Sequence, residues 1–591
     1  MAAAGKQPPG APLVSVEGRS LPRPWLDALT SIRIQRALGT VGRATLRFTD
    51  TQFKASDWYK LEAQVSIKQY DGPALFTGEV TGVAIEIAAS HAPELVVTVD
   101  DPMYKMARKT VSRTFLNQQY SAILSTLIRD HSLKPTITVD GSQPEYTLQS
   151  GTDLAFLDAV SRRTDTAWWY DPVDSSVHVA APVAAAPVAN LDIGVEGVGQ
   201  LSRFSVRAST RNTDKVVVRG WDANQGQAVS GESATLPSAE SDLVKNYPGR
   251  GSSEPTSLVV TDLGPTTPAE AKLLATSLAR ESRSDAVTAK GETALDGRLA
   301  PGVAVKVDAK PSSGTYLISE VEHVYDRRGS RTSFVAGSHR PSGLVDLLGG
   351  ERPDPGFHMG NVLAAIVVDV ADETNQGRVK VRYPVPQGKG SDVVSNWARV
   401  VSLGGGPARG AVFIPEIDDE VLVAFEGGDT RRPVVLGGLF SESKGLPAGD
   451  GAIKQAKVNF RRIASRTGNL IELSDEAGKE HILIKHGKAT HTIKVDKDDG
   501  LVITVANAPI KLTNGKATLE LAKNGDINLT GVKVTIKGSD SVTVESTKDL
   551  KLKGTSGVAV EGLKVGVKAS GTASVEATGP LTIKGATVAI N

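Results

Sequence analysis

The last stretch of the chain, from Asn459 to Asn591, is rich in Val, Ile, Thr, Lys and Gly, and no Phe, Tyr or Trp follows Phe460. A globular core rarely forms without aromatic side chains. Apolar residues two positions apart recur about every eight residues, and a corner that contains Gly or Ser follows them. Examples are Val542/Val544, Leu550/Leu552 and Val558/Val560. The repeat predicts short β-strands joined by tight corners.

One face of these strands has no cover within a single chain. In the run 532–537 the residues Val, Val and Ile alternate with Lys and Thr, so the apolar residues share a face. About twenty such side chains in the stretch gain roughly 1.5–3 kcal/mol each when fully buried, against an ordering cost of about 1–2 kcal/mol per residue. We therefore predict that three copies wrap a common axis and form a triple-stranded β-prism.

Two other architectures produce similar alternation. A membrane β-barrel needs strands of about ten residues and aromatic girdles at both interfaces, whereas the runs here are shorter and the girdles are missing. A monomeric β-solenoid matches the pattern as well. The small, aromatic-free interior favours the trimer over the solenoid.

Composition narrows the class of partner. Lys plus Arg (67) nearly cancel Asp plus Glu (66), so the charge excess typical of nucleic-acid or anionic-membrane binders is missing and we expect protein partners. The absence of cysteine excludes disulfides and thiolate catalysis, and suits folding in a reducing cytoplasm. The first twelve residues carry Gly and Pro where a signal peptide needs an unbroken apolar stretch, so we do not expect Sec export.

The 591 residues suffice for about four domains, and punctuation by Gly and Pro suggests where they divide. We predict a mainly β chain: two β-rich domains with a few helices at 1–190 and 191–350, an OB-fold at 351–445, and the prism at 446–591. About five strand candidates between Gly360 and Phe440 suit a small closed barrel.

Three helices are expected within the first two domains. Two have apolar residues at helical spacing, namely Tyr120, Ile123, Leu124, Leu127, Ile128 with His131, and Leu154, Leu157 with Val160. The third begins at a capping box, Thr267-Pro-Ala-Glu270, and continues with Leu273, Leu274 and Leu278.

Three segments have residue types that can perform chemistry. Acid–base catalysis is conceivable at Asp418-Asp419-Glu420, but a turn and a solvated strand edge is the simpler interpretation. The loop 404–410 resembles a phosphate loop yet lacks the Lys-Ser/Thr that would reach phosphate and metal. The barrel aromatics Tyr383, Trp397, Phe413 and Phe425 are expected in the core, which argues against single-strand binding.

Histidines could in principle form a metal site in a symmetric assembly. His481, His486 and His491 would be multiplied by a threefold axis. Their spacing of five alternates between the faces of a strand, so solvent-facing histidines are the simpler interpretation. We predict neither a metal site nor a cofactor.

Several segments resemble the VgrG family of spike proteins of contractile injection systems, particularly those of extracellular phage-tail-like particles, and the resemblance covers nearly the whole chain. The barrel carries the most specific matches: GRVKVRYP (377–384), WARV (397–400), FIPEIDDEVLVAF (413–425), GGD (427–429) and RPVVLGG (432–438). Looser matches in the hub are LFTGEV (75–80), FL (156–157) with WWY (168–170), and LAPG (299–302) with GTYL (314–317). Residues 467–480 are similar to the family's entry into the spike.

The resemblance implies a structural protein rather than an enzyme. It implies that domains 1–190 and 191–350 are hub β-barrel domains. The trimeric hub would dock on inner tube and baseplate proteins, and the prism would carry a PAAR-type tip protein, here on Thr587, Val588, Ala589, Ile590 and Asn591. Sheath contraction would then drive the needle through a target membrane, with cargo effectors as further partners. Assembly would take place in the cytoplasm of a bacterium, within a particle that is released in some systems; type VI secretion carries similar spikes.

The alternative function is a hydrolase or toxic effector built on a spike scaffold. Some relatives insert a lysozyme domain between barrel and spike. Only about 20 residues separate Phe440 from Asn459, far fewer than the roughly 50 residues of the smallest usual domain. We therefore expect no enzyme at that position.

Overall fold

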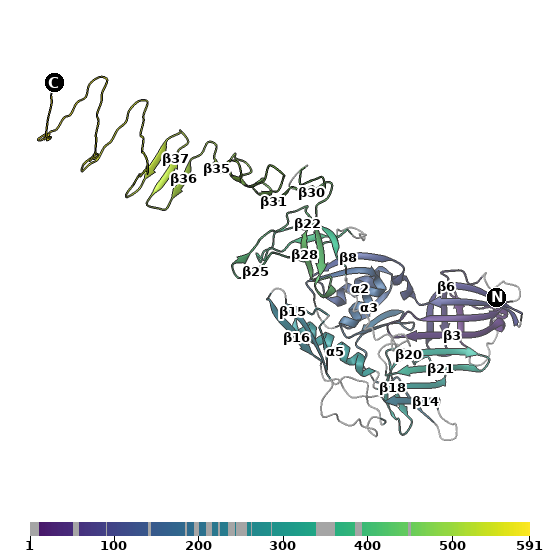
Figure 1. Ribbon diagram of the computed structural model, residues 1–591. Helices are drawn as coiled ribbons and strands as arrows, with labels where there is room; N and C mark the ends of the chain where they lie inside the picture. Colours follow the sequence, from purple (N-terminus) through teal and green to yellow (C-terminus); the bar gives the residue numbers. More distant parts are fainter. Residues whose placement is uncertain are drawn as a thin grey trace. The chain divides into compact units, whose positions relative to one another are not determined.

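The computed structural model divides the chain into two compact units, Met1–Lys444 and Gly445–Asn591 (Figure 1). It describes residues 11–50, 58–89, 91–139, 143–183, 186–193, 200–208, 215–222, 225–233, 243, 257–261, 263–284, 287–337, 361–384, 393–446 and 451–590. Strands far outnumber helices among them, which confirms the predicted mainly β class.

A sheet of thirteen strands forms the body of the first unit. Its main path is β14-β18-β21-β20-β3-β4-β7-β6-β5-β1-β2, while β19 pairs with β20 and with β13. The strands are β1 (Leu13–Val16), β2 (Arg19–Ser20), β3 (Leu29–Ala37), β4 (Arg43–Thr49), β5 (Gln64–Lys68), β6 (Ala74–Ala88), β7 (His91–Asp100), β13 (Ala189–Asp192), β14 (Leu201–Ala208), β18 (Val287–Ala294), β19 (Ala304–Asp308), β20 (Gly314–Asp326) and β21 (Gly329–Ala336).

The sheet runs across the predicted domain boundary at residue 190. Alternate residues of β3 and β4, among them Ile32 and Phe48, enter one buried cluster, as the period of two predicts. β20 belongs to the second predicted hub domain, yet it pairs directly with β3 and places Val321 opposite Arg36. The boundary in sequence therefore does not coincide with the edge of a sheet.

Two of the predicted helices are α2 (Tyr120–Asp130) and α3 (Asp153–Arg163), and they share a core. The apolar residues predicted for α2 are buried, whereas His131 is the C-cap of the helix and is half-buried; in α3 Leu157 and Val160 are buried while Leu154 is partly buried. Around them lie β8 (Thr110–Leu116), β9 (Lys134–Ile137), β10 (Tyr146–Thr152), β11 (Ala167–Asp171) and β12 (Ser176–Ala180); α1 (Arg23–Ala28) and η2 (Pro102–Ala107) are short.

The third predicted helix, α5 (Pro268–Ser284), packs on the sheet of β15 (Lys215–Asp222), β16 (Gln227–Glu232) and β17 (Ser257–Val260). Half of the predicted capping box forms, because the Glu270 N–H donates to the Thr267 hydroxyl at 3.2 Å. The Glu270 carboxylate accepts instead from the N–H of Thr266, at 3.0 Å. Its other oxygen binds two arginines, described below.

Five strands form the sheet of the predicted OB-fold, in the order β23-β22-β27-β28-β24. They are β22 (Leu363–Asp369), β23 (Lys380–Arg382), β24 (Arg399–Val400), β27 (Glu420–Phe425) and β28 (Pro433–Gly438), with the hairpin β25 (Gly405–Gly406) and β26 (Arg409–Gly410) and the short η4 (Glu426–Gly428). Tyr383 and Phe425 lie in its core as expected, and Trp397 is half-buried.

Phe413 corrects the expectation that all four barrel aromatics are core residues. Its side chain is 61% exposed. It follows the hairpin β25–β26 and lines a hollow on the outside of the barrel together with Leu403 and Leu436. The chain leaves the sheet at this hairpin, so strand alternation no longer determines which way the ring points.

Four charged side chains from three distant segments of the chain meet where the OB-fold joins the hub. Arg431 binds Asp429 through two nitrogens, at 3.1 and 2.7 Å, and Glu270 at 2.7 Å. Arg163, at the end of α3, binds the same Glu270 oxygen at 3.0 Å. Nearby, the hub residue Tyr146 enters the OB core and donates its hydroxyl to the carbonyl of Val394. Hub and OB-fold thus share a buried junction.

The second unit begins with antiparallel hairpins. The short pair β29 (Ile453–Lys454) and β30 (Lys457–Val458) precedes a five-stranded meander of β31 (Phe460–Ala464), β32 (Leu470–Ser474), β33 (His481–Lys485), β34 (Thr492–Asp496) and β35 (Gly500–Thr504). A three-stranded sheet of β36 (Ile510–Thr513), β37 (Thr518–Leu521) and β38 (Ile527–Thr530) follows. Each strand pairs with its neighbour in sequence.

After Thr530 the described chain, to Ile590, forms no strand pairs with itself. Bends recur near residues 532, 539, 547, 555, 563, 570, 578 and 586. The spacing agrees with the predicted repeat of about eight residues, and Figure 1 shows the trace running back and forth. The strand expected at 532–537 is unpaired here, because a β-strand needs a hydrogen-bonding neighbour that this segment does not find in its own chain.

Candidate assembly surface

One isoleucine of each meander strand lies directly opposite an isoleucine of the next. The strand register joins Ile463, Ile471, Ile484, Ile493 and Ile503 in a continuous row. Side chains directly opposite one another on paired strands share a face of the sheet. These five are nevertheless 41–53% exposed in the single chain. One copy therefore leaves an apolar row uncovered across the whole meander.

A second apolar row lies beside the first. The same register aligns Leu473, Ile482, Val495 and Leu501, all of them exposed. On β31 the position in this row is occupied by Arg461, opposite Leu473. The nine apolar residues of the two rows are here called the apolar face.

The opposite side of the meander mixes charged side chains with Leu470, Leu483 and Val502, and it is partly closed by its own ion pairs. Glu472 is only 6% exposed at its side chain, and its two oxygens are bound by Arg462 and by His481, the latter at 3.0 Å. The guanidinium carbon of Arg462 lies 3.9 Å from the centre of the Phe460 ring. The two sides of this sheet are thus chemically distinct.

Apolar exposure continues to the end of the described chain. In the three-stranded sheet, Leu512, Leu519 and Leu529 form one row and Ile510, Leu521 and Ile527 form another. Val542 and Val544, predicted to face inward, are exposed in the single chain, as are the corresponding pairs of later repeats. A surface of this kind along one chain is typical of an interface.

The three histidines of this unit do not gather in one chain. His481 binds Glu472 on the side of the sheet opposite the apolar face. His486 and His491 face each other across the turn between β33 and β34, with ring centres 6.1 Å apart. The prediction from a spacing of five overlooked this turn, which returns the chain so that the last two share a face.

Neither loop considered for chemistry in the barrel has a catalytic arrangement among its described residues. Asp418 adopts a left-handed φ of 72° in a tight turn, and the Asp419 carboxylate accepts the N–H of Glu416 at 2.8 Å. Glu420 begins β27. Residues 404–410 contain the small hairpin β25–β26. Asp418 and Asp419 thus lie in the predicted turn, whereas Glu420 begins the central strand of the sheet and not an edge strand.

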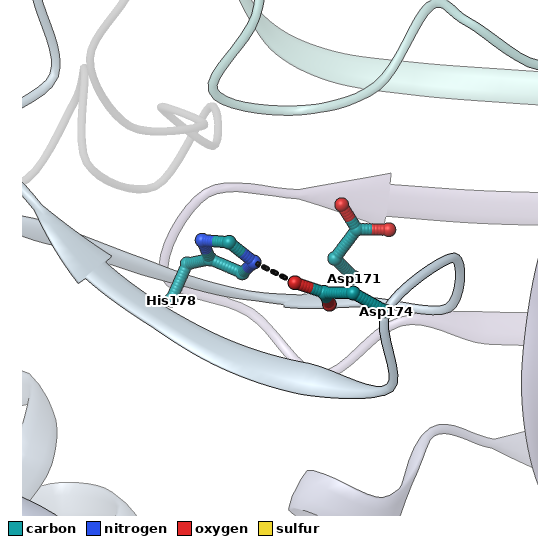
Figure 2. A group of neighbouring side chains, drawn as sticks. All are labelled: Asp171, Asp174 and His178. Atoms are coloured by element: carbon teal, nitrogen blue, oxygen red, sulfur yellow. Dashed lines mark hydrogen bonds and ion pairs between the residues drawn. The ribbon is translucent and has the colours of Figure 1, made fainter. Parts of the chain in front are cut away.

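Sequence reasoning missed one group of cation-binding residue types in the hub. Asp171, Asp174 and His178 lie close together on the β11–β12 hairpin (Figure 2). The Asp174 carboxylate accepts from the Ser176 hydroxyl at 2.7 Å and contacts the His178 ring nitrogen Nε2 at 3.2 Å. Ser176 and His178 also hold the pKa of Asp174 below its usual value, although burial opposes them. These internal bonds account for the group as a stabilised hairpin turn; the D-x-x-D-x-x-x-H spacing is its only signal in sequence.

The residues predicted to receive a tip protein end the chain. Thr587, Val588, Ala589 and Ile590 are exposed, and Asn591 lies outside the described residues. Within the part of the chain that the structure describes, no helix is long and apolar enough to span a membrane.

Comparison with known proteins places both parts of the first unit. Residues 35–328 match the phage tail baseplate hub (GPD) family, and residues 363–440 match the type VI secretion system/phage-baseplate injector OB domain. The type VI secretion system spike protein VgrG5 of Pseudomonas aeruginosa is 28% identical over 390 residues, which are 58% of this chain and 46% of that protein. VgrG4b of the same organism is 30% identical over 141 residues, 23% of this chain and 17% of the relative.

The chain thus spans about half the length of VgrG5 and less of VgrG4b. Among solved structures, a Francisella PdpA-VgrG complex is similar with a TM-score of 0.50 over 83% of this chain and 87% of that chain, at 9% identity, which supports the fold alone. The two family matches occur along the chain in the same order as the hub sheet and the OB barrel of the structure. The chain therefore has a phage tail baseplate hub domain followed by an injector OB domain, and its curated relatives are VgrG spike proteins of type VI secretion systems.

Proposed function

We propose that the chain is the central spike of a contractile injection system, in which three copies form a hub, a neck of OB-folds and a needle. The observation that carries this proposal is the uncovered apolar face, which continues into a segment with no strand partner of its own. Both features are satisfied together when further copies lie alongside, because they cover the side chains and bond the backbone.

The gain from covering the apolar face is large enough to drive assembly. Its nine side chains are about half exposed, so burying the remainder contributes roughly 0.7–1.5 kcal/mol each, or on the order of 10 kcal/mol per copy. A symmetric ring of copies closes on itself and leaves no face open. Three copies around one axis form a prism whose opposite sides, such as that of Glu472, face solvent.

The protein's work is then mechanical. The hub docks on tube and baseplate proteins, a tip protein binds the far end at Thr587–Asn591, and contraction of a sheath pushes the needle through a target membrane. The Francisella relative was solved in a complex with PdpA; by analogy, cargo effectors are further partners. Assembly takes place in the bacterial cytoplasm, in a particle that is anchored or released.

Native mass spectrometry of the full chain tests the core of this proposal. We expect a species of three times the chain mass that persists on dilution. A monomer as the main species would refute the spike. Electron microscopy of native particles, with antibody against this chain, should label the end of a tube.

The alternative of a spike-borne hydrolase is tested separately. The purified trimer is incubated with peptidoglycan and with ester substrates, and a buffer-exchanged lysozyme serves as the positive control. The proposed structural role predicts no turnover above the blank, whereas hydrolysis that copurifies with the trimer would favour the effector.

A further inference from the structure

The repeat segment, residues 531–590, does not by itself fix how the copies align along their common axis. Its bends recur about every eight residues, and the apolar pairs Val542/Val544 and Val558/Val560 occupy equivalent positions in different repeats. Sliding one copy by a whole repeat places apolar pair against apolar pair again. Alignment is weakly specified wherever a shifted pairing preserves the same faces.

Within a single chain the segment also forms no paired strands from which assembly could start. Among residues 531–590 no strand pairs with another strand of the same chain. Its backbone can therefore bond only after neighbouring copies have arrived and been aligned. Something outside the repeat has to bring the copies together.

The meander β31–β35 meets both requirements. All its strands are paired within the chain by short hairpins, which are the kind of contact that forms fast. Folding of one copy thus creates the apolar face before any partner is present. The face is ready to dock as a preformed surface.

The meander also has features that make only one alignment favourable. Turning the sheet over would direct the Glu472 carboxylate, with Arg462 and His481, towards the neighbours. Sliding by one strand would place Arg461, which occupies the second apolar row on β31, against apolar partners. The isoleucine row repeats from strand to strand, so Arg461 in the second row is what distinguishes one alignment of the meander from another.

We propose that the meander is the docking surface at which copies of this chain first join, and that it sets the alignment of the repeat segment after it. The partner is a second and a third copy of the same apolar face. The inference rests on the proposed function, because it takes the spike to be a trimer.

Two sets of substitutions in the full chain separate the roles. Ile484→Asp with Ile493→Asp places charge on the apolar face of the meander, and Val542→Asp with Val558→Asp does the same in the repeat. Thr492→Asp, one residue from Ile493 and on the opposite side of the sheet, is the matched control. Native mass at equal concentration is the readout, with circular dichroism to show that the remaining domains are folded.

We expect the first variant to lose at least nine-tenths of its trimer, while the second variant and the control stay trimeric. A trimer of the first variant, or a monomer of the second, would overturn the inference although the proposed spike would stand. If the unsubstituted chain is itself not a trimer, the proposed function fails instead.

A single cysteine reports alignment independently, because the natural chain has none. In a Val544→Cys chain, aligned copies bring three thiols together near the axis, and mild oxidation should link most chains in disulfide pairs. Adding the two meander substitutions should reduce this linkage at least tenfold. Undiminished linkage would show that the repeat aligns itself and would contradict the proposal.

Discussion

Replacing Arg431 by methionine removes the central cation of the junction between hub and OB-fold. Methionine keeps much of the apolar volume, so the change is mainly one of charge and hydrogen bonding. In the parent, the Arg431 side chain makes three bonds to Asp429 and one to Glu270, and it is only 7% exposed. After the substitution Arg163 is the arginine left in contact with the two carboxylates, at 3.0 Å from Glu270 and 3.7 Å from Asp429.

The expected cost follows from the burial of the charges left behind. Breaking a buried ion pair by removing one partner typically costs about 3–5 kcal/mol, because a charge remains without compensation. The remaining Arg163 compensates in part, so we expect about 3 kcal/mol of lost unfolding free energy. In contrast, Arg23→Met breaks an exposed pair with Asp27, at 3.6 Å, and should cost at most about 0.5 kcal/mol.

Tryptophan fluorescence during urea unfolding provides the measurement. All six tryptophans lie in the first unit, so the needle does not contribute to the signal. The Arg431→Met midpoint should fall well below those of the parent and of Arg23→Met, with folded-state spectra unchanged. A loss under about 1 kcal/mol would refute the conclusion that the four charges stabilise the junction.

Three further predictions concern the same junction and the needle. Burial alone would raise the pKa of Glu270 and of Asp429, but Arg431 and Arg163 outweigh it and hold both pKa values below the ordinary range. The resulting stabilisation is complete above the unfolded-state pKa of about 4 and declines as the pH falls below that value. The unfolding free energy should therefore fall more steeply with decreasing pH in the parent than in Arg431→Met. Val544→Asp should open the middle of the needle because three carboxylates meet near one axis, whereas Thr543→Asp should change the unfolding free energy by no more than about 0.5 kcal/mol. Equal thermal unfolding midpoints of the two variants would contradict the inward assignment of Val544. Removal of residues 581–591 should leave a trimer that no longer retains its tip protein in a pull-down, and full-strength retention would place the tip site elsewhere.

Local pattern was sufficient for much of the fold. The buried stripe of α2 follows from helical spacing of apolar residues, and the five OB strands follow from alternation between Gly- and Pro-containing turns. The eight-residue repeat was visible because each corner recurs at a constant interval. These features depend on neighbours in sequence, whose spacing the chain itself displays.

Which side chains pair across the strands of the candidate assembly surface could not be predicted from the sequence. Apolar alternation predicted that one side of the needle must be covered, but not that five isoleucines from five strands would be opposite one another. Their alignment depends on the length of each hairpin turn, since a change of one residue would move every side chain to the other face. The same turns brought His486 and His491 to one side.

Long-range pairing was decided only in three dimensions. β3 and β20 pair although nearly three hundred residues separate them, so the hub sheet crosses a boundary that composition suggested at residue 190. Glu270 was predicted as a helix cap, yet it also binds Arg163 and Arg431 from two other elements. The spacing of residues along the chain specifies which side chains share a face of a helix or strand. Which helices and strands contact one another depends instead on how their apolar faces are covered, and the packing of the whole unit decides this.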